Sequence, residues 1–197
     1  MIQVIDSRRS IRKFQDKPLA RQDIREILQA GIKAPSAKNR QPWRYVVVQG
    51  KAKAEMLSAF RRGIAREESG EALLPQSGKH LPAAKYTVEI MEQAPVILLA
   101  VNPLGKGIFA ELTCEERVYE ICNIQSIAAS IENMLLAAAE KGIGSLWICD
   151  LYFAYAEICE WLRDEGELLA AVALGYPAES PAARPRRGLA DVVSWRD

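Results

Sequence analysis

Residues 115–142 read EERVYEICNIQSIAASIENMLLAAAEKG, and this is the longest stretch of helical periodicity in the chain. Apolar side chains recur every three or four positions, which predicts a helix over 115–141 that ends at Gly142. The segment 127–139 is apolar nearly all round. Such a helix is buried on several sides, so we expect it at the centre of the fold.

Four further segments predict a buried sheet around this helix. They are apolar or β-branched, are bounded by turn residues, and cover 45–49, 95–101, 145–149 and 168–174. Amphipathic spacing predicts helices over 20–31, 52–66 and 154–165, and frequent Gly and Pro predict a mobile, loop-rich excursion over 67–86. Because helices and strands do not alternate strictly, the pattern favours an α+β fold over repeated βαβ units.

The composition is that of an ordinary globular domain. The chain has 197 residues, of which 49% are hydrophobic and 26% charged, enough for one domain with a sizeable core. Its apolar runs are too short to span a bilayer, and its first residues include no apolar signal segment. The four cysteines (Cys114, Cys122, Cys149, Cys159) form no CxxC pair. We therefore expect a cytoplasmic protein with reduced thiols and no membrane segment.

The single histidine, His80, limits the chemistry that side chains alone can perform. A zinc site built on several histidines is excluded. A Ser-His-Asp triad would have to use His80, but no nucleophile-elbow motif accompanies it. If the protein is an enzyme, a cofactor is therefore expected to supply the reactivity.

The net charge of +1 hides a strong asymmetry along the chain. Residues 1–66 carry a net +11, residues 67–183 a net −12, and residues 184–197 a net +2. Basic groups from both ends could meet over one anion, which favours a compact phosphate site. A nucleic-acid surface and a solvated basic face are the alternatives. The near-zero total charge and the absence of a nucleic-acid-binding motif argue against the first of these.

Three short segments carry candidate binding groups. RRSIR (8–12) offers guanidinium forks and a hydroxyl that suit phosphate oxygens, and RPRR (184–187) offers more. APSAKNRQPWR (34–44) is stiffened by two prolines, and its neutral amides and hydroxyls suit the heteroatom edge of a planar ring. A basic surface turn, a solvated tail and a plain helix-to-strand loop are the simpler interpretations of these segments. GIG (142–144) follows a helix, so it does not fit a dinucleotide-binding loop.

In this order, four segments of the chain resemble the FMN-dependent nitroreductase family. They are RRSIRKF (8–14), APSAKNRQPW (34–43), GIGSLWI (142–148) and LGYPAE (174–179), the last followed by RPR (184–186) and LADVV (189–193). The resemblance runs from about residue 4 to 195 and is poor over about 61–115. It implies a single nitroreductase-like domain over 1–197 with a variable excursion at about 61–90. It also implies an α+β sandwich with a mostly antiparallel central sheet flanked by helices, in an intertwined homodimer.

The resemblance further implies which residues bind FMN. The phosphate and ribityl contacts match Arg8, Arg9 and Ser10, and the C-terminal phosphate contacts match Arg184 and Arg186. Arg12 matches a basic residue at the flavin N1/O2 edge, where a positive charge stabilises the reduced flavin. In the family a loop of the partner subunit contacts the flavin ring, and this loop matches Pro35, Ser36, Ala37 and Asn39. A second stretch, whose backbone approaches the flavin N5 and O4 atoms, matches Ile148 and Cys149.

By this resemblance the protein is an oxidoreductase in which NADH or NADPH reduces FMN by hydride transfer to N5. An electron-poor acceptor, such as a nitroaromatic, a quinone or an enone, then takes the place of the nucleotide in a ping-pong cycle. No catalytic side chain and no metal are required. The alternatives are a family branch with other flavin chemistry (flavin fragmentation or dehalogenation) and a non-enzymatic phospholigand or nucleic-acid binding module.

The resemblance leaves the roles of two residues, Cys149 and Gln125, open. Many relatives have other small or polar residues near Cys149 and Asp150. A thiol beside N5 could tune the flavin or simply pack there, and we favour packing. Gln125 lies on the helix that runs along the dimer interface in relatives, where it either faces the partner or satisfies buried backbone groups.

Overall fold

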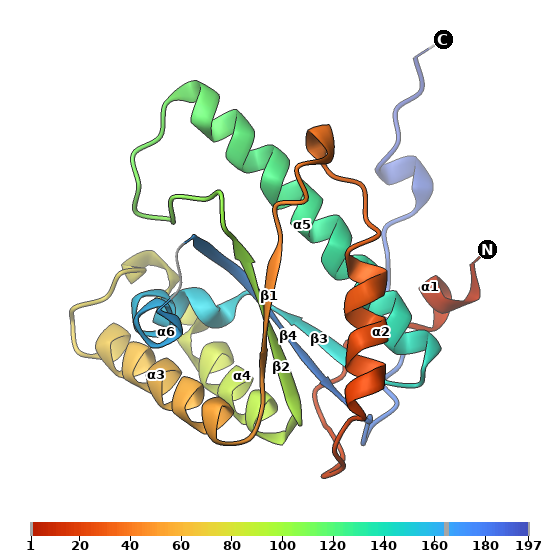
Figure 1. Cartoon of the computed structure of the whole chain (residues 1–197), viewed down its shortest axis with the longest axis horizontal. Coiled ribbons are helices and arrows are strands. Elements are labelled where there is room, and N and C mark those ends of the chain that lie inside the picture. Colours follow the sequence, from red (N-terminus) through yellow and green to blue (C-terminus); the bar gives the residue numbers. More distant parts are fainter. Residues whose placement is uncertain (1, 164–165, 197) are drawn as a thin grey trace.

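A four-stranded antiparallel sheet forms the middle layer of the molecule (Figure 1). The computed structural model describes residues 2–163 and 166–196. The strands are β1 (Arg44–Val48), β2 (Val96–Asn102), β3 (Gly144–Ile148) and β4 (Glu167–Gly175), in the spatial order β1-β2-β4-β3. Each predicted strand is present within one residue at either end, and the expected antiparallel α+β fold is confirmed.

Helices cover both faces of the sheet, which explains why β2 and β4 are buried along their whole length (Figure 1). α2 (Arg21–Gly31) and α5 (Cys114–Glu140) pack on one face, and α3 (Gly50–Glu68), α4 (Leu81–Gln93) and α6 (Tyr155–Leu162) pack on the other. Successive side chains of a strand point to opposite faces of the sheet, and each face has its own hydrophobic core. Leu98 therefore packs with α5 and Leu99 with α3. The short elements are α1 (Gln3–Ser7) and the 3₁₀ turns η1 (Ala37–Asn39), η2 (Pro75–His80), η3 (Asp150–Ala154) and η4 (Leu189–Asp191).

The long helix α5 begins and ends at strong local signals. At its start, Thr113 and Glu116 form a capping box. Beyond its end, Gly142 adopts a φ of +68°, a left-handed conformation that glycine tolerates best. By length and composition alone α5 could cross a membrane, a test that the core helix of a soluble protein also passes. It packs against α2 and the sheet, which is the position of a core helix.

The exposed apolar side chains of α5 lie in its N-terminal half, outside 127–139. Within 127–139 no large apolar side chain is exposed, because α2 and the sheet cover this described stretch. Val118, Ile121 and Ile124 are exposed instead. Gln125 is exposed as well, so within the single chain it satisfies no buried backbone group.

The expected loop-rich excursion over 67–86 is wrong in its second half. α4 begins at Leu81, because Pro82 falls in the first helical turn, where a missing amide hydrogen is tolerated. Ala84, Val88 and further side chains then follow at helical spacing and are buried. The proline therefore marks the start of a helix and not a continuing loop.

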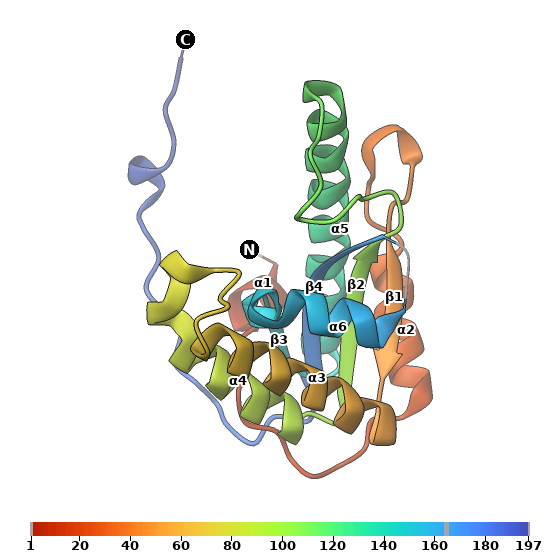
Figure 2. The same cartoon turned by 90° about the vertical axis from the view of Figure 1, so that its left-hand side faces the viewer.

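The N-terminal segment and the segment that follows β4 run side by side. The Glu179 carboxylate accepts hydrogen bonds from the amides of Arg12 (2.5 Å) and Lys13 (3.1 Å). Phe14 and Pro177 form an isolated antiparallel bridge. The chain then leaves the body as an extended tail, which both views show (Figures 1 and 2). Residues at opposite ends of the sequence are thereby held together.

Candidate functional site

Five arginines from both terminal segments line one cavity of about 350 Å³, called here the arginine cavity. Its lining contains Arg8, Arg9, Ser10, Arg12, Arg184 and Arg186, with Ile5, Asp6 and residues 181–183 beside them. The six residues named first are those assigned from the sequence to the phosphate, the ribityl chain and the N1/O2 edge of FMN. The N-terminal segment pairs with the segment that follows β4, and this pairing brings the six residues together.

The positive charge of the arginine cavity is only partly compensated. Asp6 is the one acidic residue in its described lining, and the Arg8 guanidinium lies 3.4 Å from the carboxylate of Glu132 on α5. Arg9 donates hydrogen bonds to the carbonyls of Asp6 (2.6 Å) and Arg8 (2.8 Å), which fix its guanidinium. Several guanidinium donors in one cavity suit a phosphate dianion, which accepts charge-assisted hydrogen bonds from all of them.

Strand β3 leads from the arginine cavity to a second cavity. Ser10 pairs with Ser145 near the start of β3, and the amide of Ile11 donates to the Ser145 carbonyl at 2.9 Å. Cys149 lies four residues further, about 13 Å along the strand direction. The side chain of Ile148 is buried in the core, so this residue offers only its backbone to a ligand.

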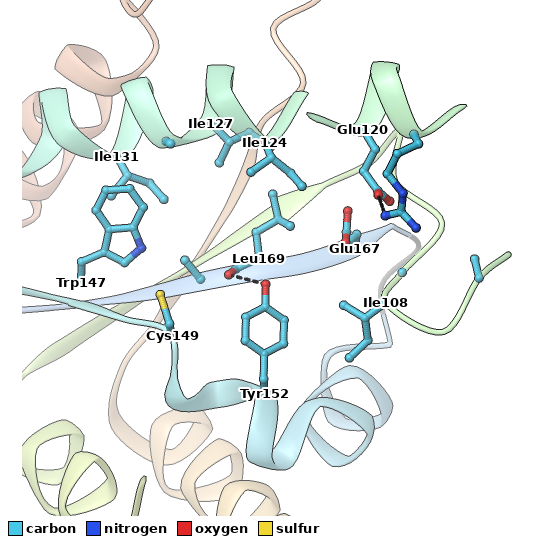
Figure 3. Close-up of a pocket in the computed structure, with 15 residues that line it drawn as sticks. Ile108, Glu120, Ile124, Ile127, Ile131, Trp147, Cys149, Tyr152, Glu167 and Leu169 are labelled. Atoms are coloured by element: carbon cyan, nitrogen blue, oxygen red, sulfur yellow. Dashed lines mark hydrogen bonds and ion pairs between the residues drawn. The ribbon is translucent and has the colours of Figure 1, made fainter. Parts of the chain in front are cut away.

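The second cavity, called here the α5 slot, has a volume of about 410 Å³ and lies between α5 and strands β3 and β4 (Figure 3). Ile124, Ile127 and Ile131 of α5 line one side, opposite Trp147 and Cys149. The indole Nε1 of Trp147 is buried and has no hydrogen-bond partner among residues 2–163 and 166–196. A buried donor without an acceptor costs free energy, so the slot suits a flat, mostly apolar ligand that carries an acceptor.

Two carboxylates, which no motif in the sequence predicted, close one end of the α5 slot (Figure 3). Glu167 at the start of β4 is 4% exposed and Glu120 of α5 is 8% exposed. Burial, and then the charge of Glu120, raise the pKa of Glu167. Glu120 accepts a hydrogen bond from Arg117 at 2.5 Å, and the Tyr152 hydroxyl donates to the Leu169 carbonyl at 3.0 Å.

The thiol of Cys149 faces the α5 slot (Figure 3). Cys149 is a free, exposed cysteine in the lining of the slot. Partial desolvation, and then the charge of Asp150, raise the pKa of the thiol and keep it protonated. The Asp150 carboxylate is held in turn by the Thr87 hydroxyl of α4, which donates a hydrogen bond at 2.6 Å.

The loop at positions 35–41 lies apart from both cavities. Its predicted contact residues Pro35, Ser36, Ala37 and Asn39 belong to the described lining of neither. The loop is attached to α5, where the amide of Ala37 donates to the Ser126 hydroxyl at 3.2 Å. A single chain therefore does not bring these residues to the arginines, which is consistent with a loop that serves a neighbouring subunit.

Comparison with known proteins covers nearly the whole chain. The model of the Nitroreductase family matches residues 5–176. An NADH dehydrogenase of Thermus thermophilus is 31% identical in an alignment that covers 96% of this chain and 92% of that protein. An NADPH-flavin oxidoreductase of Vibrio harveyi is 28% identical over 189 residues, which cover 94% of this chain and 69% of that protein.

Solved structures show the same architecture. A Desulfovibrio desulfuricans protein crystallised in complex with FMN superposes with a TM-score of 0.73 and 28% sequence identity. The superposition covers 100% of this chain and 96% of that one.

Proposed function

The chain belongs to the nitroreductase family, and from this premise we propose that it is an NAD(P)H-dependent FMN oxidoreductase. NADH or NADPH is the electron donor. Electron-poor organic molecules, such as nitroaromatics, quinones or enones, are the acceptors. Donor and acceptor use the same face of the cofactor in turn, so the kinetics are ping-pong.

The arginine cavity is the observation that carries this proposal. Segments 8–12 and 184–186 supply its guanidinium groups, and a phosphate monoester is the anion that such a donor set holds best. The α5 slot adds an apolar wall and the unpaired Nε1 of Trp147, which a flat ring with polar atoms can satisfy. The residues present therefore fit FMN, which has a phosphate at one end and such a ring at the other.

The side chains of this protein divide the work between binding and orientation. The arginine cavity holds the phosphate and neutralises its charge. The backbone at Ile148 and Cys149 orients the ring, and Arg12 is the cation that we assign to the N1/O2 edge. FMN, when bound, supplies hydride transfer at its N5 atom. Ile127 and Ile131 of α5 are buried and keep one wall of the slot apolar, which suits the apolar part of the ring.

The test of this function begins with the purified protein. We expect a yellow sample that releases intact FMN on denaturation, and whose flavin absorbance bleaches on addition of NADH or NADPH in a stopped-flow instrument. Recovery of unaltered FMN after many turnovers separates this activity from flavin fragmentation. A colourless protein that binds no added FMN would contradict the proposal, and retention of oligonucleotides by that protein would favour the binding-module alternative.

We also propose that the enzyme is a homodimer with FMN sites shared between subunits. Exposed large apolar side chains support a partner surface. They lie on the N-terminal half of α5 (Val118, Ile121, Ile124) and on the extended tail (Leu189, Val192, Trp195). The tail extends away from the rest of its own chain (Figure 2). We therefore propose that it buries these side chains against a second subunit.

Mixing two defective variants tests the shared site. One variant replaces Arg8 and Arg186, and the other replaces Ser36 and Asn39, so each homodimer is expected to bind FMN poorly. In a heterodimer both defects fall in one site and the other site is intact. Exchange of subunits should therefore restore up to about one FMN per heterodimer. Mixtures in which heterodimers form but bind no more FMN than the parents would rule out sharing.

The Cys149→Ala variant is expected to keep the reductase activity of the parent to within about twofold, because hydride transfer needs no thiol. The measurement is kcat/KM with a quinone acceptor, accompanied by the FMN content and the melting temperature. Loss of turnover with full FMN content and an unchanged melting temperature would show that the thiol takes part in the reaction.

A further inference from the structure

The loop of residues 36–41, called here the 36–41 loop, has an unfavourable backbone conformation. Lys38, Asn39 and Gln41 have φ values of +53°, +53° and +49°. In this left-handed region the Cβ atom crowds the backbone, and lysine and glutamine lack the short polar side chain that makes the region tolerable for asparagine. The loop is also largely exposed, so burial does not hold it in place.

Hydrogen bonds within the 36–41 loop account for its shape but not for its position. The amide of Asn39 donates to the Ser36 carbonyl at 2.9 Å, and the amide of Arg40 to the Ala37 carbonyl at 3.1 Å. The amide of Gln41 donates to the Ser36 hydroxyl at 3.0 Å. These bonds would move with the loop if it swung away from the helix, so contacts with α5 must fix its place.

Two residues on α5 make such contacts. The Ser126 hydroxyl accepts from the amide of Ala37 at 3.2 Å, and the ring of Tyr119 lies beneath two cations of the loop. The Arg40 guanidinium is 4.3 Å from the ring centroid and the Lys38 ammonium is 5.7 Å from it. Because Tyr119 and Ser126 are seven positions apart, they share one face of the helix and hold the loop at two points.

A further contact fixes the Tyr119 ring. The tyrosine hydroxyl donates a hydrogen bond to the Glu115 carboxylate, one turn earlier on α5, at 3.1 Å. The ring is the part of the side chain that meets the cations, whereas the hydroxyl points to its own helix. A phenylalanine at this position would therefore keep the contact with the loop.

We propose that Tyr119 is a positioning residue, which clamps the 36–41 loop in the conformation that offers Ser36 and Asn39 to the flavin of the partner subunit. This inference rests on the proposed function, because it takes the ring of FMN as the group that the loop serves. The clamp orders the loop before the cofactor arrives, so binding does not have to overcome the loop's disorder. Tyr119 itself does not touch the cofactor.

The first experiment needs no flavin. Hydrogen exchange is measured on apoprotein of the parent, Tyr119→Leu, Tyr119→Phe and a matched control, Tyr86→Leu, which removes an exposed tyrosine of α4. The amide of Ala37, which donates across to Ser126 of α5, is expected to exchange about tenfold faster in Tyr119→Leu alone. Equal exchange in Tyr119→Leu and the parent would overturn the clamp.

The second experiment measures the FMN dissociation constant of the same four proteins by fluorescence titration of the apoprotein. Tyr119→Leu is expected to raise it about tenfold, since only the fraction of molecules with an ordered loop binds well. Tyr119→Phe and Tyr86→Leu should match the parent, with melting temperatures alike in all four. A Phe variant as weak as the Leu variant would assign the effect to the bond with Glu115 and overturn the cation clamp.

The two experiments separate this inference from the proposed function. A parent that binds no FMN contradicts the proposed function, while hydrogen exchange still decides whether Tyr119 orders the loop. A parent that binds FMN normally, with Tyr119→Leu binding equally well, leaves the function standing and overturns the positioning role.

Discussion

Replacing Arg8 and Arg186 together by alanine is expected to lower the affinity for FMN by about 10²–10⁴-fold without unfolding the protein. A charge-assisted hydrogen bond to a phosphate contributes about 1.5–3 kcal/mol, and two of them account for this range at about 1.4 kcal/mol per factor of ten. Arg186 is exposed and Arg8 has only one ion pair in the described structure, at 3.4 Å from Glu132, so the fold loses little. The measurement is fluorescence titration of the apoprotein.

Two comparisons make this experiment specific. Riboflavin has the same ring as FMN but no phosphate, so its weaker binding should be unchanged in the double variant. Alanine at Arg21 and Arg25 removes the same net charge from the exposed surface of α2, and this control should bind FMN like the parent. If both double variants lose the same affinity, long-range charge and not the arginine cavity is responsible, and the phosphate assignment is wrong.

Replacing Gly63 by alanine is expected to destabilise the protein, although alanine favours a helix over glycine by about 1 kcal/mol. Gly63 lies in α3, and a Cβ atom there would approach the Cβ and Cα atoms of Ala154 to 2.3 and 2.4 Å. Ala154 belongs to η3, and backbone cannot move aside as a flexible side chain can. We expect a net loss of about 1–2 kcal/mol in the free energy of unfolding, because so close a contact places the overpacking cost at about 2–3 kcal/mol and the helix preference of alanine offsets about 1 kcal/mol of it.

Thermal unfolding measures this effect. For a chain of this size each kcal/mol lowers the melting temperature by about 2–4 °C, so a fall of about 2–8 °C is expected. Gly78→Ala is the matched control, because a Cβ atom at Gly78 would meet nothing within 4 Å. A melting temperature of Gly63→Ala at or above that of the parent would mean that α3 and η3 are not packed as closely as the structure has them.

The sheet and most helices could be predicted because local patterns and burial agree in them. The strands β2 and β4 are uninterrupted apolar runs that helices cover on both faces, so composition alone marks them. The start of α4 was missed because proline has opposite meanings in a loop and in the first turn of a helix. Only the packing of residues 81–93 on α3 decides between these meanings.

The candidate site also has one part that could be predicted from the sequence and other parts that could not. The arginine cavity was predictable, since charge is visible in the sequence and opposite ends of a chain can meet over an anion. Glu120 and Glu167 were missed because a charged residue is usually solvated, and burial depends on contacts distant in sequence. The position of Glu120, seven residues before Ile127 on one helix face, was the available signal. The left-handed backbone of the 36–41 loop has no such signal, since lysine and glutamine rarely adopt it.

The hydrogen bond between the Arg12 amide and Glu179 spans 167 positions, and this has a consequence for how the protein acquires its ligand. During synthesis the first arginines emerge early, but the cavity cannot close until the chain beyond residue 179 has been made and has paired with them. Until then the nascent protein has no arginine cavity, so a ligand that this cavity binds can enter only after the sheet is complete. Ligand binding then stabilises only molecules that have completed folding, because only these molecules contain the cavity.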